Sequence, residues 1–399
     1  MDRRRFLQGA GIAGSAALGA GLFAGSEEIA GLAQQFAGEG NVTDSDIAQL
    51  RAVGETSTDD FDPYSYVREF NWGDEIEDLG DGRKRRIFRI DALDKEIEVA
   101  PGVTFPAWAY NGQVPGPTLR ANEGDEIRVE FSNASEHPHT IHFHGIHRPE
   151  MDGVPGLGDG MIDTGDSTVY EFTAEPYGTH VYHCHSTPLK KHVHKGLYGM
   201  FVVDPPGGYD EALGEADHEF VMVMNAFDTD QDGDNEIYAV NTKAFCYAEK
   251  PLQVRQDDLV RVYLANATEF DAVNSFHLHA HFFDYYDTGR LENRRTWIDT
   301  VSQVQAQRGI LQFRPPHEGK LMFHAHQSEF AELGWLSFFD VASDPSIDSS
   351  EGRARSSEKG PADSQYRDDE TAEPDVADDV DDRTRRAGHQ VKREAGGSP

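Results

Sequence analysis

The stretch Glu123-Gly-Asp-Glu-Ile-Arg-Val-Glu-Phe-Ser-Asn133 decides the fold class of this chain. A Gly-Asp turn is followed by residues 126–131, in which apolar and charged side chains alternate as they do in a half-buried β-strand. Similar short runs, separated by Gly, Pro and Asn, occur at 87–90, 96–99, 169–172, 180–183 and 200–203. The sequence therefore predicts an all-β chain that folds as a sandwich or a barrel.

The same stretch returns in the second half of the chain. Residues 256–262 repeat the pattern of 123–129. Further motifs return in the same order with slowly growing spacing: Ala-x-Asn at 109 and 239, and His-x-His at 142 and 277 and at 183 and 324. Ordered matches of this kind indicate a duplicated domain, which we place at residues 85–206 and 214–343.

Charge and cysteine content narrow the class of protein. The chain has 399 residues, of which 71 are acidic and 36 basic, for a formal net charge of −35. This charge excludes a general nucleic-acid binder, which would carry a basic face. It is typical of a halophilic protein that stays soluble at high salt, and an acidic secreted protein at ordinary ionic strength is the alternative. Two cysteines exclude a disulfide framework.

The two ends of the chain are expected to lie outside these domains. Residues 1–26 place Arg3-Arg4-Arg5 before a weakly apolar, Gly- and Ala-rich run, which resembles a Tat export signal. We therefore expect export by Tat to the cell surface or the medium, with an uncleaved membrane anchor as the alternative. Residues 27–84 are acidic and poor in pattern, which predicts a linker. Residues 344–399 nearly lack aromatic side chains and predict a disordered acidic tail.

Histidine is the residue type that carries the chemistry. Four His-x-His pairs stand at matching positions, two in each repeat. Residues i and i+2 of a β-strand share a face, so each pair can direct two imidazoles at one point. Neutral imidazole suits Zn, Cu, Ni and Fe. The predicted metal ligands are His142, His144, His183, His185, His277, His279, His324 and His326.

Cys184 lies between His183 and His185, so it points to the opposite strand face and can serve a different metal. One thiolate, two imidazoles and a weak axial group form a blue-copper site. The spacing indicates His139 and His192 as the imidazoles, with His194 as an alternative to His192. Leu197 stands at the axial place, which would leave the copper three-coordinate and raise its potential. The alternative for Cys184 is a buried, inert thiol.

The motifs Val114-Pro-Gly-Pro-Thr118, Met151-Asp-Gly-Val-Pro155 and His183-Cys-His185 resemble those of multicopper oxidases of the laccase family. The resemblance covers residues 85–343 and implies two cupredoxin domains, which are Greek-key β-barrels. It also implies four coppers: one type 1, one type 2 and a type 3 pair. The type 1 copper takes single electrons from a phenolic, aromatic or metal-ion donor. The other three, held by the eight histidines, reduce dioxygen to water.

Two positions refine this resemblance. Asp152 matches an acidic residue near the cluster of three coppers and is expected to donate protons, although an Asp-Gly turn alone is the alternative. In the second repeat, type 1 ligands are replaced by Asn274, Ala325 and Phe330, so only the first domain is expected to hold that copper. The chain thus resembles two-domain laccases. These are similar to copper nitrite reductases in being homotrimers, with each cluster shared between subunits.

Two other functions compete with this interpretation. A copper nitrite reductase is suggested by the segment 329–334, but that family usually has Asp in place of His142 and lacks equivalents of His185 and His324. A non-catalytic copper carrier is the third possibility, and a cysteine placed between two cluster ligands argues against it. Residues 228–234 resemble the start of a calcium-binding EF-hand loop, although Ala239 stands where Glu is needed.

Overall fold

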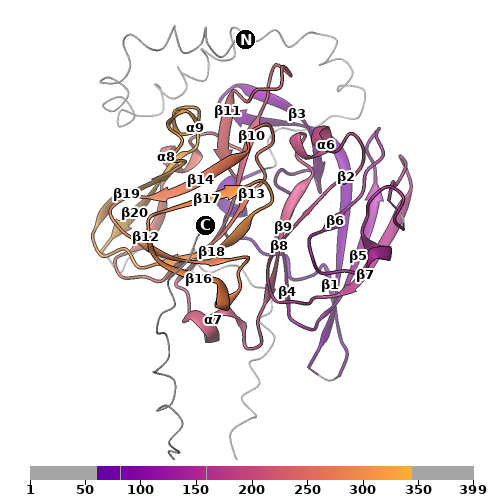
Figure 1. Cartoon of the computed structure of the whole chain (residues 1–399), viewed down its shortest axis with the longest axis horizontal. Coiled ribbons are helices and arrows are strands. Elements are labelled where there is room, and N and C mark those ends of the chain that lie inside the picture. The colour runs from indigo at the N-terminus through magenta and orange to yellow at the C-terminus, as the bar shows by residue number, and fades with distance from the viewer. Residues whose placement is uncertain (1–60, 81, 159, 344–399) are drawn as a thin grey trace, which may run out of the picture. The chain divides into compact units, whose positions relative to one another are not determined.

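The computed structural model describes residues 61–80, 82–158 and 160–343, all of which belong to one compact unit. The predicted export signal and tail lie outside the described residues, as does the linker up to residue 60. The described part is built of β-strands with a few short helices, so the all-β prediction is confirmed (Figure 1). None of its helices has the length and apolar character needed to cross a bilayer.

The first domain is a sandwich of two sheets. One sheet has the order β1-β2-β5-β7 with β3 paired to β2, and the other has the order β4-β9-β8-β6. The strands are β1 (Glu75–Asp78), β2 (Lys84–Ala100), β3 (Val103–Tyr110), β4 (Leu119–Asn122), β5 (Glu126–Asn133), β6 (His142–Phe143), β7 (Ser167–Thr173), β8 (Gly178–His183) and β9 (Tyr198–Asp204). Short helical segments are α5 (Pro63–Tyr66), η1 (Pro149–Met151) and α6 (Leu189–His194).

The second domain repeats this plan with additional strands. Its sheets have the orders β11-β10-β13-β18-β15-β16 and β12-β20-β19-β14-β17. The strands are β10 (His218–Phe227), β11 (Ile237–Val240), β12 (Leu252–Arg255), β13 (Val260–Asn266), β14 (Val273–Leu278), β15 (Phe283–Asp287), β16 (Arg294–Ile298), β17 (Thr300–Val304), β18 (Arg308–Phe313), β19 (Gly319–His324) and β20 (Leu336–Ala342). The short helices are α7 (Gly208–Leu213), α8 (Cys246–Glu249), η2 (Leu291–Asn293) and α9 (Ser328–Glu332). The parallel pairs β10–β13 and β12–β20 match β2–β5 and β4–β9 of the first domain.

Strand β2 differs from the expectation in its length. The two predicted runs at 87–90 and 96–99 belong to one continuous strand. This strand pairs with β5 up to Ala92 and with β3 from Ala92 onward. The polar residues between the two runs lie where the strand changes its partner, so they interrupt the hydrophobic pattern without ending the strand.

Residues 61–80 differ from the linker expected over 27–84. Phe61, Tyr66 and Phe70 are buried in a core to which both domains contribute side chains. The neighbouring segment also pairs with a strand of the second domain, because the Val221 backbone amide donates to the Val67 carbonyl. These few apolar residues therefore connect the two domains, although the surrounding sequence is acidic.

Buried ion pairs also join the domains. Arg120 of the first domain lies 3.1 Å from Asp204 and 2.9 Å from Glu219 of the second domain. Arg261 contacts the same Glu219 at 3.2 Å. Both guanidinium groups are buried. Removal of one member of such a network would leave an uncompensated buried charge, so the network resists separation of the domains.

Candidate metal centres

Strand β8 ends beside a compact group of one thiol and two imidazoles. The Cys184 Sγ atom lies 3.3 Å from His192 Nδ1 and 3.8 Å from His139 Nδ1. The two nitrogens are 3.1 Å apart, and all three side chains are buried. The first domain thus brings together the three side chains predicted for a type 1 copper, in a triangle small enough for one ion.

Neighbouring groups orient this triangle. His139 Nε2 lies 2.9 Å from Ser135 Oγ, which turns Nδ1 toward Cys184. Helix α6 carries His192, and the Cys184 backbone amide donates to the Leu197 carbonyl at 3.0 Å. Leu197 belongs to the same buried apolar cluster as Cys184. A backbone hydrogen bond therefore joins the two ends of the segment from Cys184 to Leu197, and this segment contains His192.

Burial sets the protonation of these groups. The pKa of His139 is lowered to about 3, mainly by burial and then by the neighbouring His192 and His137. The pKa of His192 is lowered to about 4, mainly by burial and then by His137 and Lys191. Burial also raises the pKa of the Cys184 thiol. Near neutral pH the imidazoles are ready to bind a metal, whereas the thiol must first release its proton.

His194 is separated from this group. Its Nε2 atom accepts a hydrogen bond from the Asp228 backbone amide at 3.1 Å, and its ring packs against Phe105 and Phe270. Of the two alternatives left open by the spacing, the structure therefore places His192, and not His194, beside Cys184.

A second group in the first domain consists of the histidines on β6 and at the end of β8. The antiparallel register pairs His142 with His183. His144 Nε2 lies 2.9 Å from His183 Nε2, and the His185 ring lies 5.4 Å from that of His142. The Nδ1 atoms of His142 and His183 donate to backbone carbonyls at 2.8 Å, which leaves their Nε2 atoms for a metal. We call these four residues the first half-site.

The second domain builds the same arrangement from β14 and β19. Its register pairs His277 with His324, and His279 Nε2 lies 2.9 Å from His324 Nε2. His326 completes the group, with its ring 5.0 Å from that of His277. The Nδ1 atoms of His277 and His324 again meet oxygen atoms, at 2.8 Å on Thr300 and 2.6 Å on the Ala325 carbonyl. We call these four histidines the second half-site.

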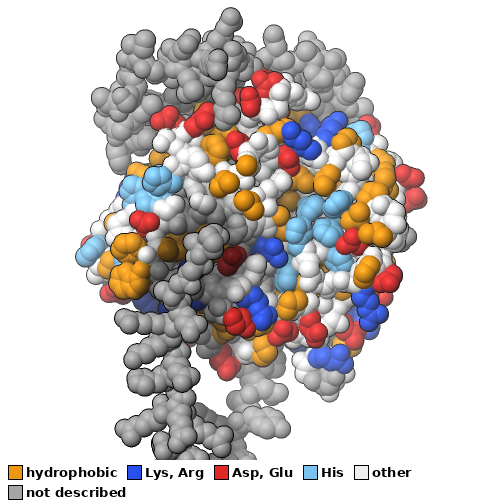
Figure 2. Space-filling view, in the orientation of Figure 1, with side chains coloured by type: hydrophobic (Ala, Val, Ile, Leu, Met, Phe, Trp, Pro, Cys, Tyr) orange, Lys and Arg blue, Asp and Glu red, His pale blue; other side chains and the backbone are white. Residues whose placement is uncertain are grey.

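The two half-sites remain apart within the chain. Among the described residues, the tight groups of potential ligands contain histidines of one domain only. Figure 2 shows the histidine side chains gathered in separate places, over the second domain at the left and over the first domain to the right of centre. A single chain therefore presents two incomplete groups and no joint cluster among these residues.

Asp152 lies beside the first half-site, as the sequence predicts. Its Oδ1 atom is 3.2 Å from His142 Nδ1 and 3.5 Å from His147 Nε2. The sequence interpretation placed His147 beside the ligands or at the surface and did not count it as a ligand. Its side chain is buried, and its Nε2 atom has no hydrogen bond among the described residues. Its position three residues after His144 was the only available signal, because the contact with Asp152 depends on how the loop folds.

In the second domain, aromatic side chains fill the place that Cys184, His139 and His192 occupy in the first domain. The Ala325 amide donates to the Trp335 carbonyl at 3.1 Å, as Cys184 does to Leu197. Phe330 stacks on Tyr238 with ring centroids 3.9 Å apart, and Trp335 is fully buried. The Asn274 amide donates to Thr268. None of these replacements offers a thiolate or an imidazole. Cys246 lies in the core of this domain.

An acidic group lies in the loop between β10 and β11. The carboxylates of Asp228, Asp230, Asp232 and Glu236 lie within 4.8 Å of one another. Glu236 therefore belongs to this acidic group, whereas Ala239 offers no carboxylate. Burial raises the pKa of Glu236 to about 7.

Comparison with known proteins identifies the family. The profile of the family described as multicopper oxidase matches residues 92–208, and a second profile with the same description matches 217–345. The chain belongs to the multicopper oxidase family. The predicted two-domain organisation with cupredoxin-like folds agrees with these two matches.

Curated relatives come from two branches. A copper-containing nitrite reductase of Neisseria meningitidis serogroup A is 30% identical over 230 residues, covering 51% of this chain and 56% of that protein. Laccase-2 of Botryotinia fuckeliana is 34% identical over 155 residues, covering 37% of this chain and 26% of that protein. The chain spans about half the length of the nitrite reductases it matches, and less of the laccase.

Solved structures support the same assignment. A crystal structure described as multicopper oxidase is 53% identical, with a TM-score of 0.68, covering 70% of this chain and 97% of that chain. A copper nitrite reductase from Nitrosomonas europaea is 26% identical, with a TM-score of 0.62, covering 67% and 97%. The chain thus matches nearly the whole length of both neighbours.

The family implies copper, and the residues present fit it. Cys184 with His139 and His192 is the donor set of a blue-copper site, and its burial excludes water. The half-sites offer only imidazoles, which also suit copper. Burial lowers the pKa of His144 to about 3 and of His183 to about 4, so these rings are neutral near pH 7.

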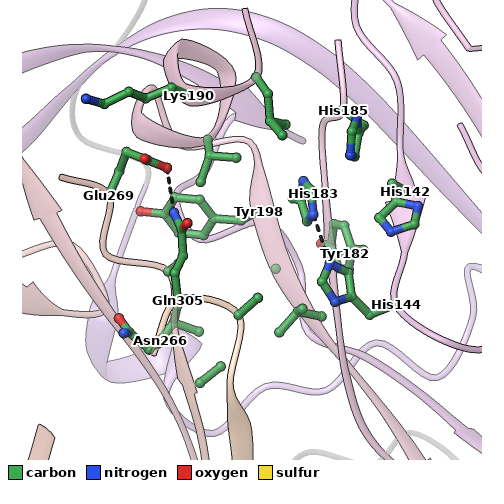
Figure 3. A pocket seen from close by; sticks show the side chains of 18 residues that line it. His142, His144, Tyr182, His183, His185, Lys190, Tyr198, Asn266, Glu269 and Gln305 are labelled. Atoms are coloured by element: carbon green, nitrogen blue, oxygen red, sulfur yellow. Dashed lines mark hydrogen bonds between the residues drawn. The ribbon is translucent and has the colours of Figure 1, made fainter. Parts of the chain in front are cut away.

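A cavity of about 570 Å³ opens beside the first half-site of this multicopper oxidase. The histidines of the first half-site line one side of this cavity. The other side is lined by Asn266, Glu269 and Gln305 of the second domain (Figure 3). The Gln305 side chain donates to the Glu269 carboxylate. The half-site is therefore reachable from outside the chain.

Proposed function

We propose that the chain is a laccase-like oxidase. It couples the one-electron oxidation of phenolic, aromatic or metal-ion donors to the four-electron reduction of dioxygen to water. The observation that carries this proposal is the second half-site, in which four histidines converge as they do in the first domain. A nitrite reductase needs fewer histidines and would leave His142, His185 and His324 without a role.

Each donor set has an assigned role in the proposal. His139, Cys184 and His192 would hold the type 1 copper, and the two half-sites would hold the type 2 copper and the type 3 pair. When bound, copper supplies the one-electron redox chemistry and the binding of dioxygen. The polypeptide supplies the connection, because Cys184 is bonded directly to His183 and His185 along the backbone. A hydrogen bond from His183 to the Cys184 carbonyl adds a second contact between the sets.

Asp152 is proposed as the proton donor for dioxygen reduction. Its carboxylate lies 3.2 Å from His142 and is 21% exposed. It can therefore exchange protons with solvent while it remains next to a cluster ligand.

We further propose a homotrimer in which the first half-site of one subunit meets the second half-site of the next. The separation of the half-sites within one chain supports this arrangement. Exposed apolar side chains in the same regions also support it: Phe282 and Trp297, near the second half-site in sequence, are 46% and 78% exposed. Leu157 and Met161, in the loop after Asp152, are 47% and 43% exposed. Such side chains are typical of surfaces that become buried on association.

Export by Tat, to the cell surface or the medium, is part of the same proposal, because a Tat substrate folds and can acquire its metal before export. Its support is the arginine-rich start of the sequence, which precedes a weakly apolar run.

Copper content and electron balance test the proposed function. We expect about four coppers per chain in copper-saturated protein, measured by elemental analysis. The electron balance requires four one-electron donors for each dioxygen, measured with an oxygen electrode and 2,6-dimethoxyphenol. A content of about two coppers without dioxygen uptake would exclude an oxidase.

Nitrite reduction is the second candidate, favoured by the curated nitrite reductases of the comparison. It predicts nitric oxide from nitrite under anaerobic conditions with a reduced donor. A copper carrier, the third candidate, predicts copper binding without turnover of either acceptor.

A further inference from the structure

Two exposed lysines lie on α6 directly before His192. Lys191 Nζ is 5.3 Å from the ring centroid of Trp108, and Lys190 Nζ is 4.0 Å from that of Phe270. Within the described part of the chain, neither lysine lies within ion-pair distance of a carboxylate. By contrast, Arg85 and Arg128 on the exposed sheet of the same domain each pair with glutamates. The lysines are thus uncompensated positive charges in a chain with a net charge of −35.

Trp108 connects this surface to the thiol group. Its ring centroid lies 4.7 Å from that of His192 and 5.1 Å from that of His139. The Trp108 ring centroid also lies 4.7 Å from that of the exposed His137. The indole is itself buried, so it lies between an exposed imidazole and the two buried ones. A molecule resting on His137 and Lys191 would be separated from the proposed type 1 site by this one aromatic ring.

We propose that Lys190, Lys191 and His137, named here the donor patch, bind small anionic electron donors next to the buried Trp108 ring. The inference rests on the proposed oxidase function and specifies its substrate class. Positive charge beside the site attracts anions and raises their rate of encounter, and the cationic side chains hold them in place. The oxidation itself removes one electron from the donor, and four such electrons, with four protons, reduce one dioxygen to two waters. For hexacyanoferrate(II), which becomes hexacyanoferrate(III), it breaks no bond and releases no proton.

The surroundings of the donor patch favour a small donor over an acidic protein. Helix α6 adjoins the acidic loop, because His194 contacts the Asp228 backbone. The carboxylates of that loop would repel an extended acidic surface. Glu269, whose carboxylate accepts a hydrogen bond from Gln305, lines the same cavity as Lys190 and adds negative charge on that side. The positive charge is therefore confined to an area that suits a compact anion.

A redox-inert anion tests the binding without relying on turnover. Hexacyanocobaltate(III) has the shape of hexacyanoferrate and can be followed by equilibrium dialysis with cobalt analysis. We expect the double variant Lys190→Gln/Lys191→Gln to bind it roughly tenfold more weakly, with each single variant contributing about threefold. The matched control is Lys250→Gln. Lys250 is also exposed and also lies over an aromatic ring, Tyr64, but it follows α8 of the second domain. Equal binding by wild type and double variant, or an equal loss in the control, would overturn the inference.

Kinetics then links the binding to the donor. We expect the KM for hexacyanoferrate(II) to rise by a similar factor in the double variant, while the KM for the neutral 2,6-dimethoxyphenol stays the same. Added salt should reduce the difference, because it screens exposed charges. An equal rise for both donors would overturn charge selection. Should wild type oxidise neither donor but bind the anion through the lysines, the proposed oxidase function fails and the anion site stands.

Discussion

At the scale of single residues, Cys184 is shared by both parts of the proposed machinery. It supplies the thiol of one donor set and is bonded to two histidines of the other. We expect Cys184→Ser to lose the blue absorption and donor oxidation, while the half-sites still load copper. Visible spectroscopy, oxygen uptake and copper analysis on one preparation check this. Persistence of turnover in the variant would rule out the path through Cys184.

Substitution of Asp152 is expected to affect proton transfer to dioxygen without affecting copper binding. Asp152→Asn keeps the size of the side chain and leaves the backbone carbonyl that accepts from His142. We expect reoxidation of the reduced enzyme by dioxygen to slow by roughly a hundredfold, with unchanged copper content. Stopped-flow mixing with dioxygen measures the rate. The exposed neighbour Glu150, changed to Gln, serves as control and should leave the rate unaltered.

The buried histidines predict acid lability of the copper-free protein. Burial lowers the pKa of His139 and His144 to about 3 and of His192 to about 4. The folded state therefore keeps these rings neutral, whereas the unfolded chain takes up protons below about pH 6.5. Their stabilising contribution is complete above that pH and is lost as the pH falls toward 4. Glu236, with its pKa raised to about 7, and the buried carboxyls of Asp204 and Asp228, with pKa values also raised by burial, act in the opposite sense but are fewer than the buried histidines.

Urea unfolding of copper-free protein between pH 7.5 and 4.5 measures this dependence. We expect the midpoint to fall steadily as the pH decreases, and bound copper to flatten the curve because it competes with protons for the same nitrogens. A midpoint that rises toward acid pH would contradict the assignment of the histidines as neutral.

Among single residues, sequence spacing predicted which histidines lie close together, but it did not predict their surroundings. His142 and His144 could be named because a strand places residues i and i+2 on one face. His147 could not, since its contact with Asp152 arises from the fold of a loop. The choice between His192 and His194 also stayed open until the structure placed the latter against Asp228.

At the scale of elements, hydrophobic alternation located strands but not their limits. The runs at 87–90 and 96–99 belong to one strand because β2 exchanges one partner for another at Ala92. Tyr66 and Phe70 were missed because their burial requires side chains of the second domain, which are far away in sequence. Local pattern carries information on which face is buried, whereas such non-local contacts leave no periodic signal.

The loop that carries α6 depends on Gly196. This residue has φ of +114°, and a Cβ there would lie 2.5 Å from Val114 Cγ2 and 3.0 Å from the Trp108 carbonyl. We expect Gly196→Ala to lower the free energy of unfolding by about 2 kcal/mol or more and to alter the blue absorption, because α6 holds His192.

Gly165 provides the matched control for this substitution. It also has positive φ, +84°, but a Cβ there meets nothing within 4 Å. Gly165→Ala should therefore show only the cost of backbone strain, roughly 1 kcal/mol, with an unchanged spectrum. Urea unfolding of both variants, followed by circular dichroism, measures the difference. Equal losses would mean that steric crowding around Gly196 has no effect on α6.

At the scale of the whole molecule, the proposed oxidase would need a second chain to complete each of the separated half-sites. Light scattering should give three chains per particle for the wild type. Trp297 is 78% exposed and contacts Phe282 with ring centroids 5.7 Å apart. We expect Trp297→Glu to shift the particle toward single chains, with loss of cluster copper and dioxygen uptake but retention of the blue absorption. Lys320→Gln, an exposed change in β19, is the control. A fully active monomer would refute shared clusters.

The contacts between domains lie beyond what the sequence could predict. Arg120 and Glu219 are 99 residues apart, and nothing in either local pattern marks them as partners. The repeat did predict two similar domains, because duplicated strands leave duplicated motifs. The way in which those domains face each other depends on such single, distant pairs.

The aromatic filling of the second domain has a consequence for mixtures of subunits. In the second domain, Phe330 and Trp335 fill the region that holds the type 1 donor set in the first domain. Each chain would therefore have a single site at which electrons enter. In the proposed trimer, a chain with a damaged Cys184 would inactivate the one cluster to which it passes electrons. The other two clusters would remain active. In trimers assembled from intact and damaged chains, activity would then decline in direct proportion to the fraction of damaged chains. A damaged chain would not lower the activity of the intact chains beside it.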